Sequence, residues 1–217
     1  SFFLLLALFI FLAQPCRGFE TSTQTWSSLI YDHKVGDSAY RVRLQNRYRF
    51  DEGRGFEEQL NLRYQHRVGT WQLGARFVLG TVDAYQKLGE LRYVGFGQRT
   101  WKLPKTYKYR LRLLQEVRDF PEADQLAYRS RLLNEFSRSL DASQKTTLVL
   151  SSEFNYYLND FQPGTTGLSS HRTILGFRRR PKAWLWGLSL LHDYRLFPGE
   201  DQQRFVLVWT LAFRDGG

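Results

Sequence analysis

The sequence has a single cysteine, Cys16, and it lies beside an apolar segment at the N-terminus. If that segment is removed during export, no cysteine remains. Disulfide bonds, thiol nucleophiles and cysteine-based metal sites are then excluded. A chain exported without disulfides must be stabilised by its core or by its sheet.

Long hydrophobic runs are also scarce. Beyond the N-terminus no apolar run approaches the roughly 18 residues of a membrane-spanning helix. Residues 2–13 are almost purely apolar, but Gln14 and Pro15 interrupt the run. Such a segment is short for a span and suits a secretory signal peptide. Cys16 and Gly18 are small residues at the −3 and −1 positions, which predicts cleavage after Gly18. A lipoprotein signal around Cys16 and an uncleaved anchor are the alternatives.

Acidic residues are few relative to basic ones. The 217 residues include 31 Lys and Arg against 21 Asp and Glu, for a formal net charge of +10. If the charge gathers on a reachable surface, nucleic acid, anionic lipid and acidic small molecules are candidate partners. No composition shift or low-complexity tract marks a domain boundary. We predict a signal peptide over residues 1–18 and one domain over residues 19–217.

Alternation of polar and apolar residues dominates the rest of the chain. In AYRVRLQNRYRF, residues 39–50, apolar side chains alternate strictly with Arg and Gln. Turn-forming Gly, Pro and Asp separate such segments. This pattern predicts an all-β meander. About eleven segments begin near residues 24, 39, 58, 71, 90, 107, 126, 146, 171, 184 and 203.

Two all-β architectures fit this alternation. A soluble barrel buries its apolar face, whereas an outer-membrane barrel turns it to lipid and lines its lumen with polar residues. The export signal, the long segments, the aromatic residues at segment ends and a last strand that ends on Phe213 favour the membrane. We predict a single antiparallel up-and-down transmembrane β-barrel of about 10–12 strands in the outer membrane of a Gram-negative bacterium. Because such barrels normally have even strand numbers, twelve is favoured and ten comes next.

Several short motifs carry a family resemblance. They are Trp26, Glu90-Leu-Arg92, Arg110-x-Arg112-x-x-x-Glu116-x-Arg118, Arg129-x-Arg131 and Glu153-Phe154. In this order they resemble the Gram-negative family catalogued as domain of unknown function 2490, over essentially the whole chain after residue 18. The resemblance implies an outer-membrane barrel. It implies no activity, substrate or catalytic residue.

Arginines crowd the polar face of the predicted strands. The lumen-lining or anion-binding candidates are Arg41, Arg43, Arg47, Arg63, Arg92, Arg110, Arg112, Arg118, Arg129, Arg131 and Arg178. Their candidate acidic partners are Glu90, Glu116, Glu135, Glu153 and Asp193. One interpretation is a structural lattice of arginine–carboxylate pairs. The other is a narrow anion-favouring pore, because rings of Arg are expected in anion channels and unpaired buried charge is costly.

Other partners and cofactors find little support in the sequence. Single-strand nucleic-acid binders stack bases on aromatic residues inside a basic groove, whereas here arginines and aromatics alternate across two faces. There is no glycine-rich phosphate loop and no metal-ligand spacing. We therefore predict no cofactor, no metal and no nucleic acid. The expected partners are outer-membrane lipid and, in the lumen, anions or acidic solutes.

Two alternative functions stay open. An exported soluble β-barrel could bind an acidic ligand. An outer-membrane lipid hydrolase or deacylase would need a serine within hydrogen-bond reach of a histidine. Ser169 and Ser170 stand beside His171, and Ser189 is near His192 but on the opposite face of its segment. None of these pairs is specific enough to be assigned as catalytic.

Overall fold

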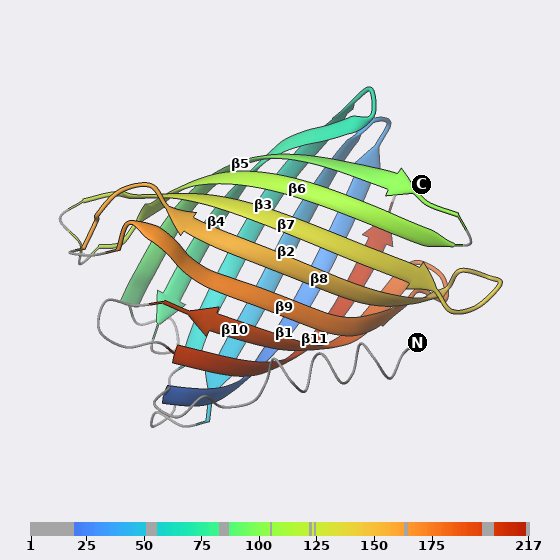
Figure 1. Cartoon of the computed structure of the whole chain (residues 1–217). Helices are drawn as coiled ribbons and strands as arrows, with labels where there is room; N and C mark the ends of the chain where they lie inside the picture. Colours follow the sequence, from blue (N-terminus) through green and yellow to red (C-terminus); the bar gives the residue numbers. More distant parts are fainter. Residues whose placement is uncertain are drawn as a thin grey trace.

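The computed structural model is a closed barrel of eleven strands (Figure 1). It describes residues 20–50, 56–82, 87–104, 106–121, 123, 125–162, 165–196 and 202–215, so the predicted signal peptide lies outside the described residues. The strands are β1 (Glu20–Val35), β2 (Ser38–Arg49), β3 (Phe56–Val68), β4 (Trp71–Val82), β5 (Lys87–Lys102), β6 (Tyr107–Asp119), β7 (Ala127–Ser139), β8 (Thr146–Tyr157), β9 (Gly167–Arg179), β10 (Trp184–Arg195) and β11 (Gln202–Asp215). In the described part of the chain, no helix is long and apolar enough to cross a membrane.

The strand order confirms the all-β barrel and the range of about 10–12 strands. Consecutive strands pair antiparallel, and β1 closes the barrel by pairing parallel with β11 (Figure 1). The favoured even number is wrong. The first segment lies in the sheet along its length, from Glu20↔Gln202 to Val35↔Ser38. A parallel closing pair makes an odd number possible, because the first and last strands then run in the same direction.

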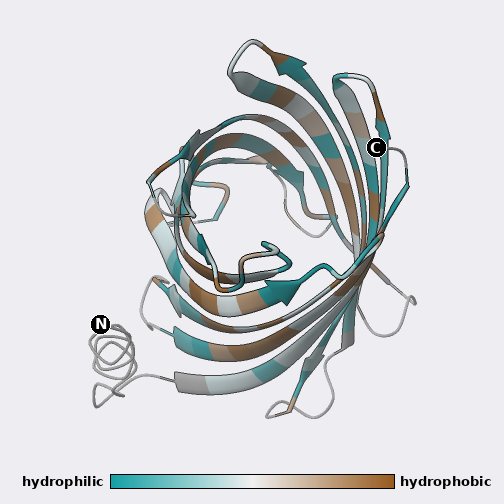
Figure 2. Cartoon of the chain, turned by 90° about the vertical axis from the view of Figure 1, so that its right-hand side faces the viewer, coloured by the Kyte–Doolittle hydropathy of each residue, from teal (hydrophilic) through white to brown (hydrophobic). Residues whose placement is uncertain are grey.

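Alternate residues of each strand face the interior. On β2, Arg41, Arg43 and Arg47 point inward, whereas Tyr40 and Leu44 are exposed on the outer surface. Figure 2 shows the strands curving around a common interior, with hydrophilic and hydrophobic residues alternating along them. The alternation in the sequence therefore separates the inward-facing residues from the outward-facing ones.

The interior also contains apolar side chains. Trp26, Leu191 and Val206 form one buried cluster. A second cluster is made by Val94, Phe96 and Leu114. A Cβ atom at Gly74 would lie 2.5 Å from Cζ of Phe96 and 2.3 Å from the carbonyl oxygen of Tyr64, so only glycine permits this close approach.

The two ends of the barrel differ in their connections. At the short-turn end, β1 ends at Val35 and β2 begins at Ser38, so two residues connect them. There Gly36 adopts a φ of 56°, a left-handed conformation that favours glycine. At the long-loop end, β8 ends at Tyr157 and β9 begins at Gly167, so nine residues connect them. β1 and β11 both begin at the long-loop end.

Candidate functional site

Glu116 on β6 is the centre of an ion-pair network inside the barrel. Its carboxylate accepts hydrogen bonds from Arg76 Nη2 at 3.2 Å, Arg129 Nε at 2.9 Å and Arg131 Nη1 at 2.6 Å. The Glu116 side chain is 0% exposed. The register places Arg129 directly opposite it on β7. Three guanidinium groups thus share one fully buried carboxylate.

The network continues around the wall. Glu153 accepts from Arg131 Nη2 at 2.6 Å and from Arg172 Nη1 at 3.4 Å. Asp193 accepts from Nε of Arg172 and Nε of Arg195, both at 2.9 Å. Charges therefore alternate without interruption from β4 to β10. We call the following residues the lumen lattice: Arg76, Glu116, Arg129, Arg131, Glu153, Arg172, Asp193 and Arg195.

The other two predicted acids, Glu90 and Glu135, each bond to two arginines that are not part of the lumen lattice. Glu90 bonds to Arg92 at 2.6 Å and also to Arg118. Glu135 bonds to Arg110 and, at 3.3 Å, to Arg178. Each of the five acids singled out in the sequence is thus buried and contacts at least two arginines.

Two carboxylates of the interior were missed in the sequence. Asp32 on β1 accepts from Arg41 Nε at 2.6 Å, and Glu57 on β3 accepts from Arg47 Nη1 at 3.1 Å. Asp32 and Trp26 both stand at even-numbered positions and therefore lie on the same face of β1. This shared face was the sequence signal that could have identified Asp32 as an interior residue. Glu57 lies at the start of its strand, where a boundary is hardest to predict.

Three of the predicted lumen arginines bond to no carboxylate among the described residues. Arg43 donates to Ser28 Oγ at 2.9 Å. Arg63 donates to the side-chain oxygen of Gln65, and Arg112 Nε donates to Gln98 Oε1 at 2.7 Å. The expected pairing therefore breaks down at these positions.

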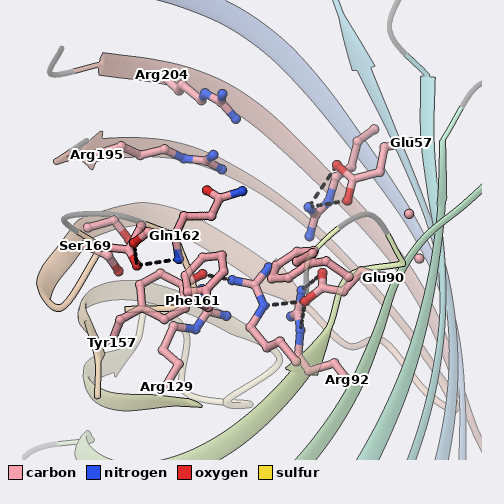
Figure 3. A pocket seen from close by; sticks show the side chains of 18 of the residues that line it. Glu57, Glu90, Arg92, Arg129, Tyr157, Phe161, Gln162, Ser169, Arg195 and Arg204 are labelled. Carbon is pink, nitrogen blue, oxygen red and sulfur yellow. Dashed lines mark hydrogen bonds and ion pairs between the residues drawn. The ribbon is translucent and has the colours of Figure 1, made fainter. Parts of the chain in front are cut away.

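A cavity of about 800 Å³ lies at the long-loop end. Among the described residues, Glu57 and Glu90 are the acids that line it. Figure 3 shows Arg195 and Arg204 extending into the cavity from one wall, with Glu57 and Glu90 on the opposite side. We call this cavity the arginine vestibule. Its eight lining arginines are Arg47, Arg49, Arg92, Arg118, Arg129, Arg172, Arg195 and Arg204.

Aromatic rings cover part of the vestibule. Phe120, after β6, stacks on Phe161 in the β8–β9 connection, with ring centroids 5.5 Å apart. Tyr157 lies 4.8 Å from Phe161. The guanidinium carbon of Arg118 lies 4.7 Å from the centre of the Phe120 ring. The vestibule therefore offers both cationic groups and flat apolar surfaces.

Asp160 and Thr166 of the β8–β9 connection are joined by hydrogen bonds. Asp160 Oδ1 accepts from the hydroxyl of Thr166 at 2.6 Å and from its backbone N–H at 2.7 Å. These bonds favour the charged carboxylate and lower the pKa of Asp160 below its ordinary value. Phe161 and Gln162, which follow Asp160, line the vestibule (Figure 3).

The outer face of the described strands carries two serine–histidine contacts, and in the first of them Ser38 Oγ lies 2.9 Å from His66 Nδ1. Ser152 Oγ lies 2.8 Å from His171 Nε2, and the His171 ring stacks on Phe154. Ser152 was missed, because register between strands is not readable from the sequence. Ser189 is in the interior beside Gly176, whereas His192 stacks outside on Phe205. No carboxylate of the described residues bonds to His171, so the catalytic triad is incomplete.

A metal centre finds no support in the described ranges, where no group of three or more His, Cys, Asp or Glu side chains could hold an ion.

Among known proteins, a family model described as "Protein of unknown function (DUF2490)" matches residues 23–204. This match confirms the family resemblance. It runs from β1 into β11 and thus includes the lumen lattice. No curated protein and no solved structure matches the chain.

Proposed function

We propose that this chain, which belongs to the family of unknown function DUF2490, spans the outer membrane of a Gram-negative bacterium and binds an acidic solute in the arginine vestibule. The observation that carries the proposal is the lining of the vestibule, with eight arginines and two glutamates among its described residues. Arginine presents several N–H donors in a fixed plane, so a guanidinium already bonded to a carboxylate can still bind another anion.

The outer surface supports a membrane location. Large apolar side chains such as Leu44 on β2, Leu113 on β6 and Leu207 on β11 are about half exposed. In water this band would be an aggregation-prone surface, whereas lipid solvates it.

Aromatic residues support the same location. At the short-turn end, Tyr109 lies between Trp101 and Phe136, with ring centroids 5.3 and 4.7 Å away. Trp184 and Phe213 pack together farther around this end. Such a girdle is typical of the membrane interface, and shorter turns are typical of the periplasmic side. We therefore place the vestibule on the external side.

The arrangement of side chains inside the barrel is evidence for a closed lumen. The vestibule and a second cavity at the short-turn end share no lining residue in the described part of the chain. Arg76 and Glu116 of the lumen lattice and the buried cluster of Val94, Phe96 and Leu114 line neither of these two cavities. Side chains fill the interior of narrow barrels in this way. The proposal therefore favours a braced, closed barrel over an open anion pore.

Electrophysiology tests the closed lumen. The folded barrel, identified by a change in electrophoretic mobility on boiling, is expected to give no steady conductance in planar lipid bilayers. Steady anion-selective currents would favour the narrow anion pore instead. A protein that stays soluble without detergent and shows no mobility change would contradict the membrane location.

Ligand binding tests the vestibule. A flat trisulfonated aromatic dye is expected to bind the barrel in non-ionic detergent, because it matches both the arginines and the rings. Arg195→Gln should weaken binding about tenfold, since a charge-assisted hydrogen bond contributes about 1.5–3 kcal/mol. Fluorescence anisotropy at fixed ionic strength measures this.

Arg178→Gln is the matched control for dye binding. Arg178 bonds to Glu135 and does not line the vestibule. Its replacement removes the same charge and should leave dye affinity unchanged. Equal losses in the two variants, or no dye binding by the unaltered protein, would contradict a specific vestibule site.

A further inference from the structure

Three arginines of the interior have no carboxylate partner among the described residues. Arg43, Arg63 and Arg112 donate only to neutral oxygens of the described residues. Nearby, Arg110 bonds to Glu135. A buried guanidinium without a counter-charge is costly. These arginines therefore favour an anion that the described chain does not supply.

Arg63 has unfavourable electrostatic surroundings. It stands directly between Arg41 and Arg76 in a row across β2, β3 and β4. Like charges opposite each other destabilise a sheet. Arg41 is compensated by Asp32 and Arg76 by Glu116, whereas Arg63 has no carboxylate partner in the described strands. Its Nε is buried without a hydrogen-bond partner in the structure.

Gln98 holds Arg63 and Arg112 together. Its Oε1 accepts from Arg112 Nε at 2.7 Å and from Arg63 Nη2 at 3.5 Å. Its amide nitrogen donates to Gln72, which turns the carbonyl oxygen toward the arginines. The two guanidinium carbons also lie 4.3 Å and 5.6 Å from the centre of the Phe96 ring. A neutral amide thus positions two cations without neutralising them.

A cavity of about 270 Å³ at the short-turn end reaches Arg63. Its described lining contains five basic residues and two acids. The basic residues are Lys34, Arg41, Arg63, Arg67 and Arg214, and the acids are Asp32 and Asp37. The cavity is about a third of the size of the vestibule and suits a small anion.

We propose that Arg63 and Arg112, positioned by Gln98, form a second site that binds a small oxyanion entering from the short-turn end. The planar guanidinium groups match the paired oxygens of phosphate or carboxylate. Arg63 lines the short-turn cavity, and none of Arg63, Arg112 and Gln98 lines the vestibule, so the site does not depend on the solute bound there. It gives the barrel a second anion site in addition to the vestibule.

Inorganic phosphate is the probe, and resistance to unfolding is the readout. A ligand that binds only the folded state lowers the unfolding equilibrium constant about a hundredfold at a concentration 100 times its Kd. Phosphate is therefore expected to stabilise the barrel in urea at constant ionic strength, with chloride as the reference salt. No phosphate-specific stabilisation of the unaltered protein would overturn the proposal.

Gln98→Glu should replace the anion with a built-in carboxylate. The side chain keeps its size while its oxygen gains the charge that Arg63 and Arg112 lack. The variant is expected to be more stable than the unaltered protein without phosphate and to lose at least about tenfold in phosphate affinity. Undiminished phosphate affinity would overturn the proposal. Unchanged dye binding would show that the vestibule is a separate site.

Gln45→Glu is the matched control. It adds the same charge beside Arg47, which already has Glu57 as a partner. Its phosphate response should equal that of the unaltered protein. If Gln98→Glu does not fold, Arg63→Gln serves in its place and should abolish the phosphate response. A retained response in that variant would refute the site.

Discussion

Glu116→Gln is expected to lower the free energy of unfolding by about 3–5 kcal/mol, the range for breaking a buried ion pair from one side. Glutamine has nearly the same size, so the packing of β6 is preserved. The variant leaves Arg76 and Arg129 without a carboxylate, and Arg131 keeps only Glu153. Urea unfolding in detergent micelles, followed by tryptophan fluorescence, measures the loss.

Glu57→Gln is the comparison for this effect. Glu57 pairs with Arg47 alone among the described residues, and its side chain is 26% exposed. Its replacement should lower the free energy of unfolding by only about 1 kcal/mol. The double variant Glu116→Gln, Arg129→Gln should recover part of the loss, because one unpaired guanidinium is removed. Equal losses for Glu116→Gln and Glu57→Gln would contradict a lattice centred on Glu116.

Leu113→Arg is expected to reduce the free energy of unfolding by about 2–4 kcal/mol in lipid vesicles, as for a cation at the middle of a membrane barrel. Leu113 is the central residue of β6 (Tyr107–Asp119) and is 50% exposed on the outer face. In a soluble barrel the same substitution would be a surface change within about 0.5 kcal/mol. The experiment therefore tests which solvent surrounds the barrel.

Leu158→Arg controls for the introduced charge. Leu158 follows the end of β8 and is 53% exposed, so its exposure matches that of Leu113. Because it lies at the edge of the strand region, its replacement should cost no more than about 1 kcal/mol. Reversible unfolding from vesicles compares the two variants. Similar, small effects would contradict the membrane-spanning proposal and favour the soluble barrel.

The pairing of charges was partly predictable. Alternation placed Arg110, Arg112 and Glu116 on one face of their strand, and neighbouring segments supplied Glu135 and Arg129. Antiparallel neighbours of this kind were expected to meet, and Arg110–Glu135 and Arg129–Glu116 do. Arg112 shows the limit of the prediction. It shares this face but lies opposite Gln98 on β5, because register decides which partner each arginine meets.

The sequence by itself determined the all-β fold, the number of alternating segments and the gathering of the arginines on one face of the strands, because side chains in a strand alternate with a period of two. Only the tertiary structure decided that β1 closes on β11 in parallel. It also decided that Glu116 serves three arginines and that Arg63 and Arg112 share an amide in place of a carboxylate. These features depend on register and closure, which bring together residues far apart in the chain. Local alternation carries no information about either.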